Sequence, residues 1–148
     1  MLDKKIAIAC DHAGFETKEY IKEILTHKSY EVLDLGTHSN ERTDYPDYAR
    51  ALCESLNPKD SHTKGILICG SGIGMSIAAN RYAHIRAALC KDSQMAQLSR
   101  AHNDANVLCL GARITNKDEI KGIVSAFLDT EFEGGRHIDR IKKLHTKD

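Results

Sequence analysis

The chain has 148 residues, enough for one compact domain with a sizeable hydrophobic core over residues 1–148. Lys plus Arg and Asp plus Glu both number 21, so the formal net charge is zero and no overall charge attracts nucleic acid or anionic lipid. No apolar run approaches the roughly 18–20 residues of a membrane span, and the N-terminus lacks the apolar core of a signal peptide. We therefore expect a cytoplasmic protein without a membrane or nucleic-acid partner. The five cysteines have no CxxC spacing, which indicates neither a disulfide framework nor a zinc site.

Five short apolar runs predict the strands of a parallel sheet. Each has four or five residues and is mostly continuous rather than alternating, as in strands that are buried on both faces. The runs are Lys5–Ala9, Glu31–Leu35, Gly65–Cys69, Arg86–Leu89 and Val107–Leu110.

Helical patterns separate these runs. Apolar residues recur every three or four positions from Tyr45 to Leu56 and from Ile120 to Leu128, the spacing of amphipathic helices. Pro46 suits the first turn of the first helix, and Thr115 with Asp118 predicts a capping box before the second. This alternation predicts an α/β protein with three α/β/α layers and a five-stranded parallel sheet.

The most informative segment is GILICGSGIGMSIAA, residues 65–79. A strand ends at Cys69, and a loop with three glycines leads into a helix. Such a loop exposes backbone N–H groups that attract anions and favours the thiolate form of a nearby cysteine. Neither a Walker A loop nor a dinucleotide fingerprint matches, and Met75 stands where a thiol phosphatase has arginine. The segment predicts a cradle for an oxyanion or polar substrate, and the alternative is a tight turn with an inert cysteine.

Other candidates follow from the rule that ligands bind at the carboxyl ends of parallel strands. Asp11 and His12 follow the first strand, His102 and Asn103 follow the fourth helix, and Arg113 follows the last strand. We expect these residues to converge on one edge of the sheet. The alternative is structural, because Asp and His also occur in turns and a histidine at a helix end complements the dipole.

The basic segment from Gly134 to Asp148 forms a predicted C-terminal helix. Arg136 and Arg140 would share one helical face and, with His137, could clamp a phosphate. The alternative is a solvated basic tail. The apolar stripe of this segment is limited to three residues, Ile138, Ile141 and Leu144. We therefore expect the segment to pack on a partner or a cleft.

Five segments together resemble the type B ribose-5-phosphate isomerases, whose family also contains the galactose-6-phosphate isomerase subunits. They are CDHAG (10–14), ERTDYP (41–46), GILICGSGIGMSIAAN (65–80), QLSRAHNDANVL (97–108) and EGGRH (133–137). The resemblance covers nearly the whole chain in the same order. It implies a Rossmann-like domain that interconverts ribose 5-phosphate and ribulose 5-phosphate, in the non-oxidative pentose phosphate pathway, without a metal or organic cofactor.

The resemblance also implies roles for individual residues. Cys69 would be the base that moves a proton between the reacting carbons, and His102 would open the furanose ring with help from Asp11. The enediolate would be stabilised by the loop amides, at Gly70, Gly72 and Gly74. Sugar contacts would come from Ser71, Tyr45 and Asn103. The phosphate would be bound by His12, Arg113, Arg136, His137 and Arg140.

In the family that the chain resembles, the site is shared across a homodimer, or a dimer of such dimers, and the partner supplies the C-terminal basic segment. Cys69 favours the branch that uses a cysteine base, because Met75 and Ser76 stand where the other branch has a glutamate. All the segments are present in one chain, which favours a self-sufficient homo-oligomer. The alternatives are an isomerase of a six-carbon sugar phosphate, such as allose or galactose 6-phosphate, and a non-catalytic sugar-phosphate binding module.

Overall fold

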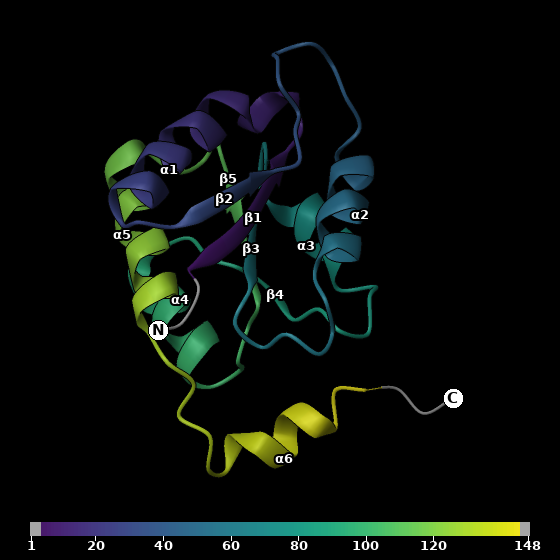
Figure 1. Cartoon of the computed structure of the whole chain (residues 1–148), viewed down its shortest axis with the longest axis vertical. Helices are drawn as coiled ribbons and strands as arrows, with labels where there is room; N and C mark the ends of the chain where they lie inside the picture. The colour runs from purple at the N-terminus through teal and green to yellow at the C-terminus, as the bar shows by residue number, and fades with distance from the viewer. Residues whose placement is uncertain (1–3, 146–148) are drawn as a thin grey trace.

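The computed structural model describes residues 4–145, and they form a single parallel sheet flanked by helices (Figure 1). The strand order is β2-β1-β3-β5-β4, and every neighbouring pair is parallel. The strands are β1 (Lys5–Cys10), β2 (Glu31–Asp34), β3 (Lys64–Cys69), β4 (Ala87–Leu89) and β5 (Val107–Gly111). The predicted five-stranded parallel sheet is therefore confirmed, with strand ends that differ by one residue from the predicted runs.

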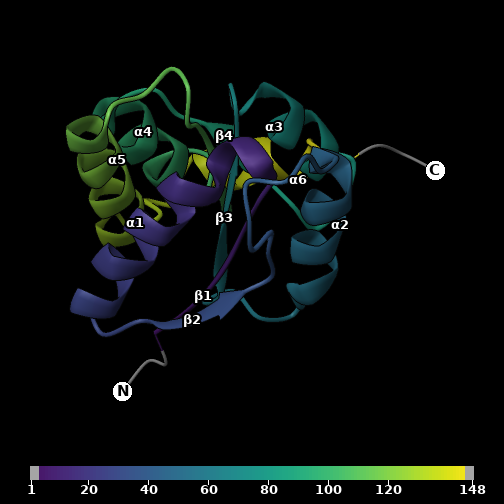
Figure 2. The ribbon, with the colours of Figure 1, turned by 90° about the horizontal axis from the view of Figure 1, so that it is seen from above.

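Helices cover both faces of the sheet, which confirms the three-layer Rossmann-like architecture (Figure 2). One face packs against α1 (Phe15–His27), α4 (Ser93–Ala101) and α5 (Lys117–Asp129). The other face packs against α2 (Tyr45–Ser55) and α3 (Ile73–Ala79). A short 3₁₀ helix, η1 (His12–Gly14), connects β1 to α1. No helix within residues 4–145 is long and apolar enough to cross a membrane.

The central strands are apolar without interruption because both of their faces are buried. In β1, Ile6 and Ile8 pack on the side of α1 and α5, while Ala7 and Ala9 pack on the side of α2. Small residues on this second face allow α2 to approach closely. A methyl group added at Gly65 of β3, for example, would lie 2.7 Å from a methyl carbon of Leu52.

The start of α5 corrects one expectation. Asn116, and not Thr115, is the N-cap: its Oδ1 accepts a hydrogen bond from the Glu119 amide at 2.9 Å, and its Nδ2 donates to Glu119 Oε1 at 2.7 Å. The reciprocal pairing that was predicted for Thr115 and Asp118 therefore occurs one residue later. Asn accepts from an exposed helix-start amide as well as Thr does, so the pattern alone permits either register.

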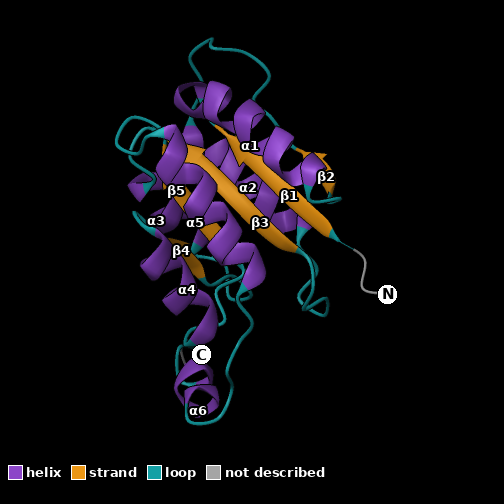
Figure 3. Ribbon diagram, turned by 90° about the vertical axis from the view of Figure 1, so that its left-hand side faces the viewer, coloured by secondary structure: helices purple, strands orange, loops and turns teal. Residues whose placement is uncertain are grey.

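The last helix, α6 (His137–Lys142), lies apart from the three layers, beyond the amino ends of the strands (Figures 1 and 3). Ile138 and Leu144 are 43% and 63% exposed, so this segment adds little to the core. A cleft of about 630 Å³ separates it from the body, with Tyr82, Arg86 and Asn103 among its lining residues. The last three residues of the predicted basic segment, 146–148, lie outside the described residues.

Candidate active site

Cys69 ends β3 at the carboxyl edge of the sheet and is only 5% exposed. Its Sγ accepts a hydrogen bond from the backbone N–H of Gly72 at 3.2 Å. Gly72 makes this contact with a φ of +79°, a conformation that favours glycine. A methyl group there would also lie 2.6 Å from Leu89 Cδ1 and 2.9 Å from the Leu110 carbonyl carbon. The turn that brings an amide to the sulfur therefore requires glycine at position 72.

The loop uses two of its own amides internally. Gly72 donates to the sulfur, and the Ile73 amide donates to Ser71 Oγ at 3.2 Å. The family resemblance implies that the loop amides as a group stabilise an enediolate. In the structure the Gly72 amide donates its hydrogen bond to the sulfur itself.

The loop is fixed to the segment that follows β5. The Ala112 amide donates to the Cys69 carbonyl, and the Arg113 amide donates to the Gly70 carbonyl, both at 2.9 Å. The Arg113 side chain lies over the loop, since its Nη1 would be 3.3 Å from a Cβ at Gly70. The Arg113 side chain thus lies beside Gly70, the residue that follows Cys69.

Asp11 and His12 lie at the same edge. The Asp11 amide donates to the Ile68 carbonyl at 3.2 Å, and Asp11 Oδ1 caps η1 by accepting from Ala13 N–H at 3.0 Å. His12 is joined to Thr43, whose Oγ1 accepts from the His12 amide at 3.0 Å and whose amide lies 3.2 Å from His12 Nδ1. This pairing orients the imidazole and ties it to the segment that leads to α2.

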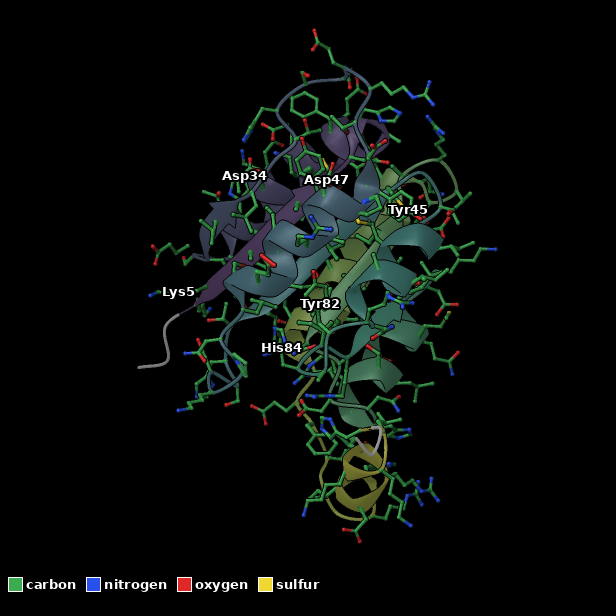
Figure 4. All side chains as sticks on the ribbon, turned by 90° about the vertical axis from the view of Figure 1, so that its right-hand side faces the viewer. Lys5, Asp34, Tyr45, Asp47, Tyr82 and His84 are labelled. Atoms are coloured by element: carbon green, nitrogen blue, oxygen red, sulfur yellow. The ribbon has the colours of Figure 1, made fainter. Side chains whose placement is uncertain are left out.

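Tyr45 begins α2 and faces the first turn of α3. Figure 4 shows it at the end of the sheet opposite to Lys5, the first residue of β1. Its ring covers Gly74, where a methyl group would lie 2.6 Å from Tyr45 Cζ. Together these residues form the group that we call the cysteine half-site: Asp11, His12, Tyr45, Cys69, the loop Gly70–Gly74 and Arg113.

A second group lies where α4 ends and α6 begins. The rings of His102 and His137 are stacked, with centroids 4.4 Å apart and planes 14° from parallel. Their Nε2 atoms lie 3.8 and 3.7 Å from the same carboxylate oxygen of Glu133. A cavity of about 250 Å³ opens among them. We call this group the histidine half-site: His102, Asn103, Glu133, Arg136, His137 and Arg140.

The histidine half-site is electropositive apart from Glu133. Desolvation, followed by the neighbouring His102 and Arg136, lowers the pKa of His137, and Glu133 partly opposes this effect. His137 is therefore largely neutral at pH 7. Two stacked imidazoles between two arginines resist a second positive charge.

His102, Glu133 and His137 are also the residues within 4–145 whose spacing could hold a metal ion, because their ligand atoms all lie within 4.8 Å of one another. One feature opposes a divalent cation there: the cationic residues Arg136 and Arg140 line the cavity beside these side chains. The arrangement is better suited to a phosphate and to proton transfer.

The two half-sites lie at opposite ends of the sheet, so the expected convergence holds for Asp11, His12 and Arg113 beside Cys69 but is wrong for His102 and Asn103. Cys69 is paired in register with Gly111, the last residue of β5, whereas His102 precedes Val107, the first. At about 3.3 Å per residue, β5 separates them by roughly 15 Å. One five-carbon sugar phosphate is too short to contact both groups in the same chain.

The remaining cysteines differ from Cys69 in their surroundings. Burial raises the pKa of Cys10 and Cys90 to about 11 and that of Cys53 to about 12. Burial also raises the pKa of Cys109. These four side chains are protonated at neutral pH and behave as small apolar core residues.

Comparison with known proteins identifies the family. The model of the ribose/galactose isomerase family matches residues 6–144. The chain belongs to this family. Both half-sites fall within the matched region, and the protein is an isomerase of the type B ribose-5-phosphate isomerase group.

Individual members of the isomerase family are close relatives. The chain is 50% identical to ribose-5-phosphate isomerase B of Escherichia coli over 143 residues, which covers 95% of this chain and 94% of that protein. The structure of the Thermotoga maritima ribose 5-phosphate isomerase superposes with a TM-score of 0.90 at 53% identity, covering 95% of this chain and 96% of that one. The ribose-5-phosphate isomerase B of Mycoplasma genitalium, solved with bound ribulose-5-phosphate, gives 0.91 at 42% identity and covers 95% and 93%.

Two residues of these half-sites were missed in the sequence analysis. Thr43 and Glu133 lie inside the segments ERTDYP and EGGRH, by which the isomerase family was recognised, but neither received a role. Thr43 orients His12. Glu133 contacts both stacked histidines.

Proposed function

We propose that this protein interconverts ribose 5-phosphate and ribulose 5-phosphate through an enediolate. The observation that carries the proposal is the hydrogen bond from Gly72 to the sulfur of Cys69, at the ligand-binding edge of the sheet. The relatives support the substrate, since the E. coli protein is a ribose-5-phosphate isomerase and the M. genitalium structure holds ribulose-5-phosphate. The reaction belongs to the non-oxidative pentose phosphate pathway, which we place in the cytoplasm.

In this mechanism Cys69 is a base rather than a nucleophile. The thiolate removes the proton from C2 of the open-chain aldose, the hydroxyl proton moves from O2 to O1 of the enediolate, and the thiol returns the carbon-bound proton to C1. A single mobile base serves both steps, and the chemistry requires no resident metal or organic cofactor. The developing oxyanion is assigned to the amides of Ser71 and Gly74, because the Gly72 amide is already directed at the sulfur. Ser71 and Tyr45 line the sugar on either side of the loop.

The complete site is proposed to form between two copies of the chain. The cysteine half-site of one copy faces the histidine half-site of the other, so that His102 and Asn103 reach the sugar, with Asp11 assisting ring opening. Arg136, His137 and Arg140 then bind the phosphate together with His12 and Arg113 of the first copy. The roughly 15 Å between half-sites in one chain supports this arrangement.

The C-terminal segment supports the same arrangement. We propose that residues 1–148 form one domain whose basic segment, 134–148, packs on the partner of a homodimer. Ile138 and Leu144 expose apolar surface on and beyond α6, and the cleft beside them is wide enough to admit side chains of another copy. Pairing of two such dimers is compatible with this contact.

A turnover assay with ribose 5-phosphate tests the proposed function. We expect the wild-type protein to produce ribulose 5-phosphate and the Cys69→Ala variant to lose activity by about 10²–10⁴-fold while it stays folded. Allose 6-phosphate and galactose 6-phosphate, tested in parallel, should give a lower kcat/KM. Wild-type protein without turnover of ribose 5-phosphate would refute the function, and an active Cys69→Ala variant would refute the base.

A further inference from the structure

The Glu133 carboxylate lies within ion-pair distance of both histidines of the histidine half-site. A single oxygen, Oε1, lies 3.8 Å from His102 Nε2 and 3.7 Å from His137 Nε2. The two rings are stacked, and the Nε2 atoms of both lie near this one oxygen. The carboxylate is therefore shared by a residue from the end of α4 and a residue from the start of α6.

The backbone around Glu133 is built to hold this position. The Glu133 amide donates to the carbonyl of Ala101, the residue before His102, at 3.0 Å. The next two residues, Gly134 and Gly135, have φ values of +71° and +57°, which favour glycine. This left-handed pair reverses the chain so that His137 returns onto the His102 ring, where it is buried. The geometry is thus specified by the sequence and does not depend on a flexible side chain alone.

The charges around the pair explain why a carboxylate is needed. The charged or titratable groups that act on His137 are His102, Glu133, Arg136 and Arg140, and Glu133 is the only anion among them. The His137 ring stacks on His102 at 4.4 Å, and desolvation, His102, Arg136 and Arg140 lower the pKa of His137. A carboxylate at ion-pair distance from both rings can stabilise one proton on the pair.

We propose that Glu133 is a positioning residue for His102, and that its carboxylate stabilises the imidazolium that His102 forms during ring opening. The proposal rests on the proposed function, in which His102 opens the furanose. There the anomeric hydroxyl loses its proton to His102, the C1–O4 bond breaks as the aldehyde forms, and the ring oxygen takes up the proton that His102 carries, which regenerates the neutral imidazole. No electrons leave or enter the sugar. The contacts of 3.7 and 3.8 Å are expected to shorten when substrate is bound.

The phosphate links the two roles of the pair. When a phosphate dianion is bound by Arg136, His137 and Arg140, it attracts a proton to His137 without help from Glu133. The carboxylate is then available to His102 alone. In this way the phosphate of the substrate and the ring-opening residue His102 are coupled through the Glu133 side chain.

The test compares Glu133→Gln with a matched control, Glu131→Gln, which removes an exposed carboxylate two residues away in the same segment. Imidazole titrations of His102 and His137 are followed by NMR in the substrate-free protein, with the His102→Asn variant used for assignment. Glu133→Gln should lower the His102 midpoint by about one pH unit. The corresponding limb of the pH profile of kcat/KM should shift in the same direction, with kcat reduced roughly tenfold. The Glu131→Gln variant should match the wild type.

Several outcomes would overturn the proposal. An unchanged His102 midpoint in Glu133→Gln would do so, as would an equal loss of activity in Glu131→Gln. Should Glu133→Gln not fold, Glu133→Asp carries the test, because a shorter carboxylate should produce a smaller shift in the same direction. Failure of the proposed function is distinguishable, since it appears as wild-type protein that does not isomerise ribose 5-phosphate, whatever the midpoint of His102.

Discussion

The ring of Tyr45 lies directly on the α-carbon of Gly74. A methyl group at position 74 would fall 2.6 Å from Cζ of the ring and 2.7 Å from Cε1. This contact joins the first turn of α2 to the first turn of α3 beside the Cys69 loop. It fixes the position of a hydroxyl-bearing side chain with respect to the proposed base.

Substitution Gly74→Ala should therefore displace Tyr45. Alanine is favoured over glycine inside a helix by about 1 kcal/mol, so we expect little loss of thermal stability. We expect kcat/KM on ribose 5-phosphate to fall by roughly tenfold or more, because a shift of about 1 Å at a substrate contact is costly. The control is Gly122→Ala in α5, where the nearest obstacle is the mobile hydroxyl of Ser93. Unaltered kinetics in Gly74→Ala would remove Tyr45 from the sugar site.

A mixing experiment tests the shared site. Cys69→Ala and His102→Ala should each be inactive alone, because each removes one half-site from every active site. After the two variants are unfolded together and refolded, mixed dimers contain one intact site out of two. Random pairing should then restore about a quarter of the wild-type activity.

The control for mixing is Cys69→Ala refolded with Cys69→Ser, a pair that lacks the cysteine in every site and should remain inactive. Recovery in the Cys69→Ala and His102→Ala mixture, together with no recovery in this control, is the expected pattern. If the Cys69→Ala and His102→Ala mixture contained folded mixed dimers and still had no activity, the half-sites would not combine between chains.

Arg136→Ala should weaken binding of the substrate more than it slows the chemistry. A charge-assisted hydrogen bond to phosphate contributes about 1.5–3 kcal/mol, which corresponds to an increase in KM of roughly 10- to 100-fold. Because the phosphate lies far from the reacting carbons, kcat should change much less. The matched control is Arg50→Ala on the exposed surface of α2. A KM that does not rise in Arg136→Ala would place the phosphate elsewhere.

Asp34 should make the stability of the protein sensitive to acid. Burial alone would raise its pKa, but hydrogen bonds from Lys18 and Lys22 and from the Gly36 amide lower it from 3.8 to about 2. A lowered pKa in the folded state means that the stabilisation is complete above pH 4 and is lost as the pH falls toward 2. We expect the free energy of unfolding to decrease over this range by on the order of 1–2 kcal/mol from this group, after allowance for solvent screening.

Denaturant titrations at pH 5 and near pH 2 measure this effect. Asp34→Asn should abolish the acid-dependent part, and it should also destabilise the protein at pH 7 by about 3–5 kcal/mol, because Lys18 is fully buried and would lose its partner. The control is Asp129→Asn, whose carboxylate is exposed and lies 3.9 Å from Lys28. If Asp34→Asn kept the acid sensitivity of the wild type, Asp34 would not be the cause of the acid-dependent loss of stability.

Local patterns were sufficient to predict the layers and the Cys69 loop. Continuous apolar runs such as Gly65–Cys69 are diagnostic of strands that are buried on both faces, and β3 differs from that run by one residue. The cap of α5 was misplaced because Thr115 and Asn116 are both competent N-caps, and only the helix geometry chooses between them.

The error about His102 has a different cause. The residue was assigned to the carboxyl edge because it lies near a strand, although it precedes β5 and so must lie at the amino edge. Strand direction alone would have given the correct placement. Glu133 and the Lys18–Asp34 pair, by contrast, depend on contacts between distant segments, which a single sequence does not specify.

The placement of the half-sites on opposite edges of the sheet has a consequence for how the protein behaves when it is scarce. Under the proposed arrangement a solitary chain carries the base with only part of the phosphate site at one end of the sheet, and the rest of the phosphate site without a base at the other. At protein concentrations below the dissociation constant of the dimer, the enzyme would then lose its activity without unfolding any of its secondary structure. Specific activity would rise with enzyme concentration until the chains are paired, so cellular abundance itself would act as a threshold for flux.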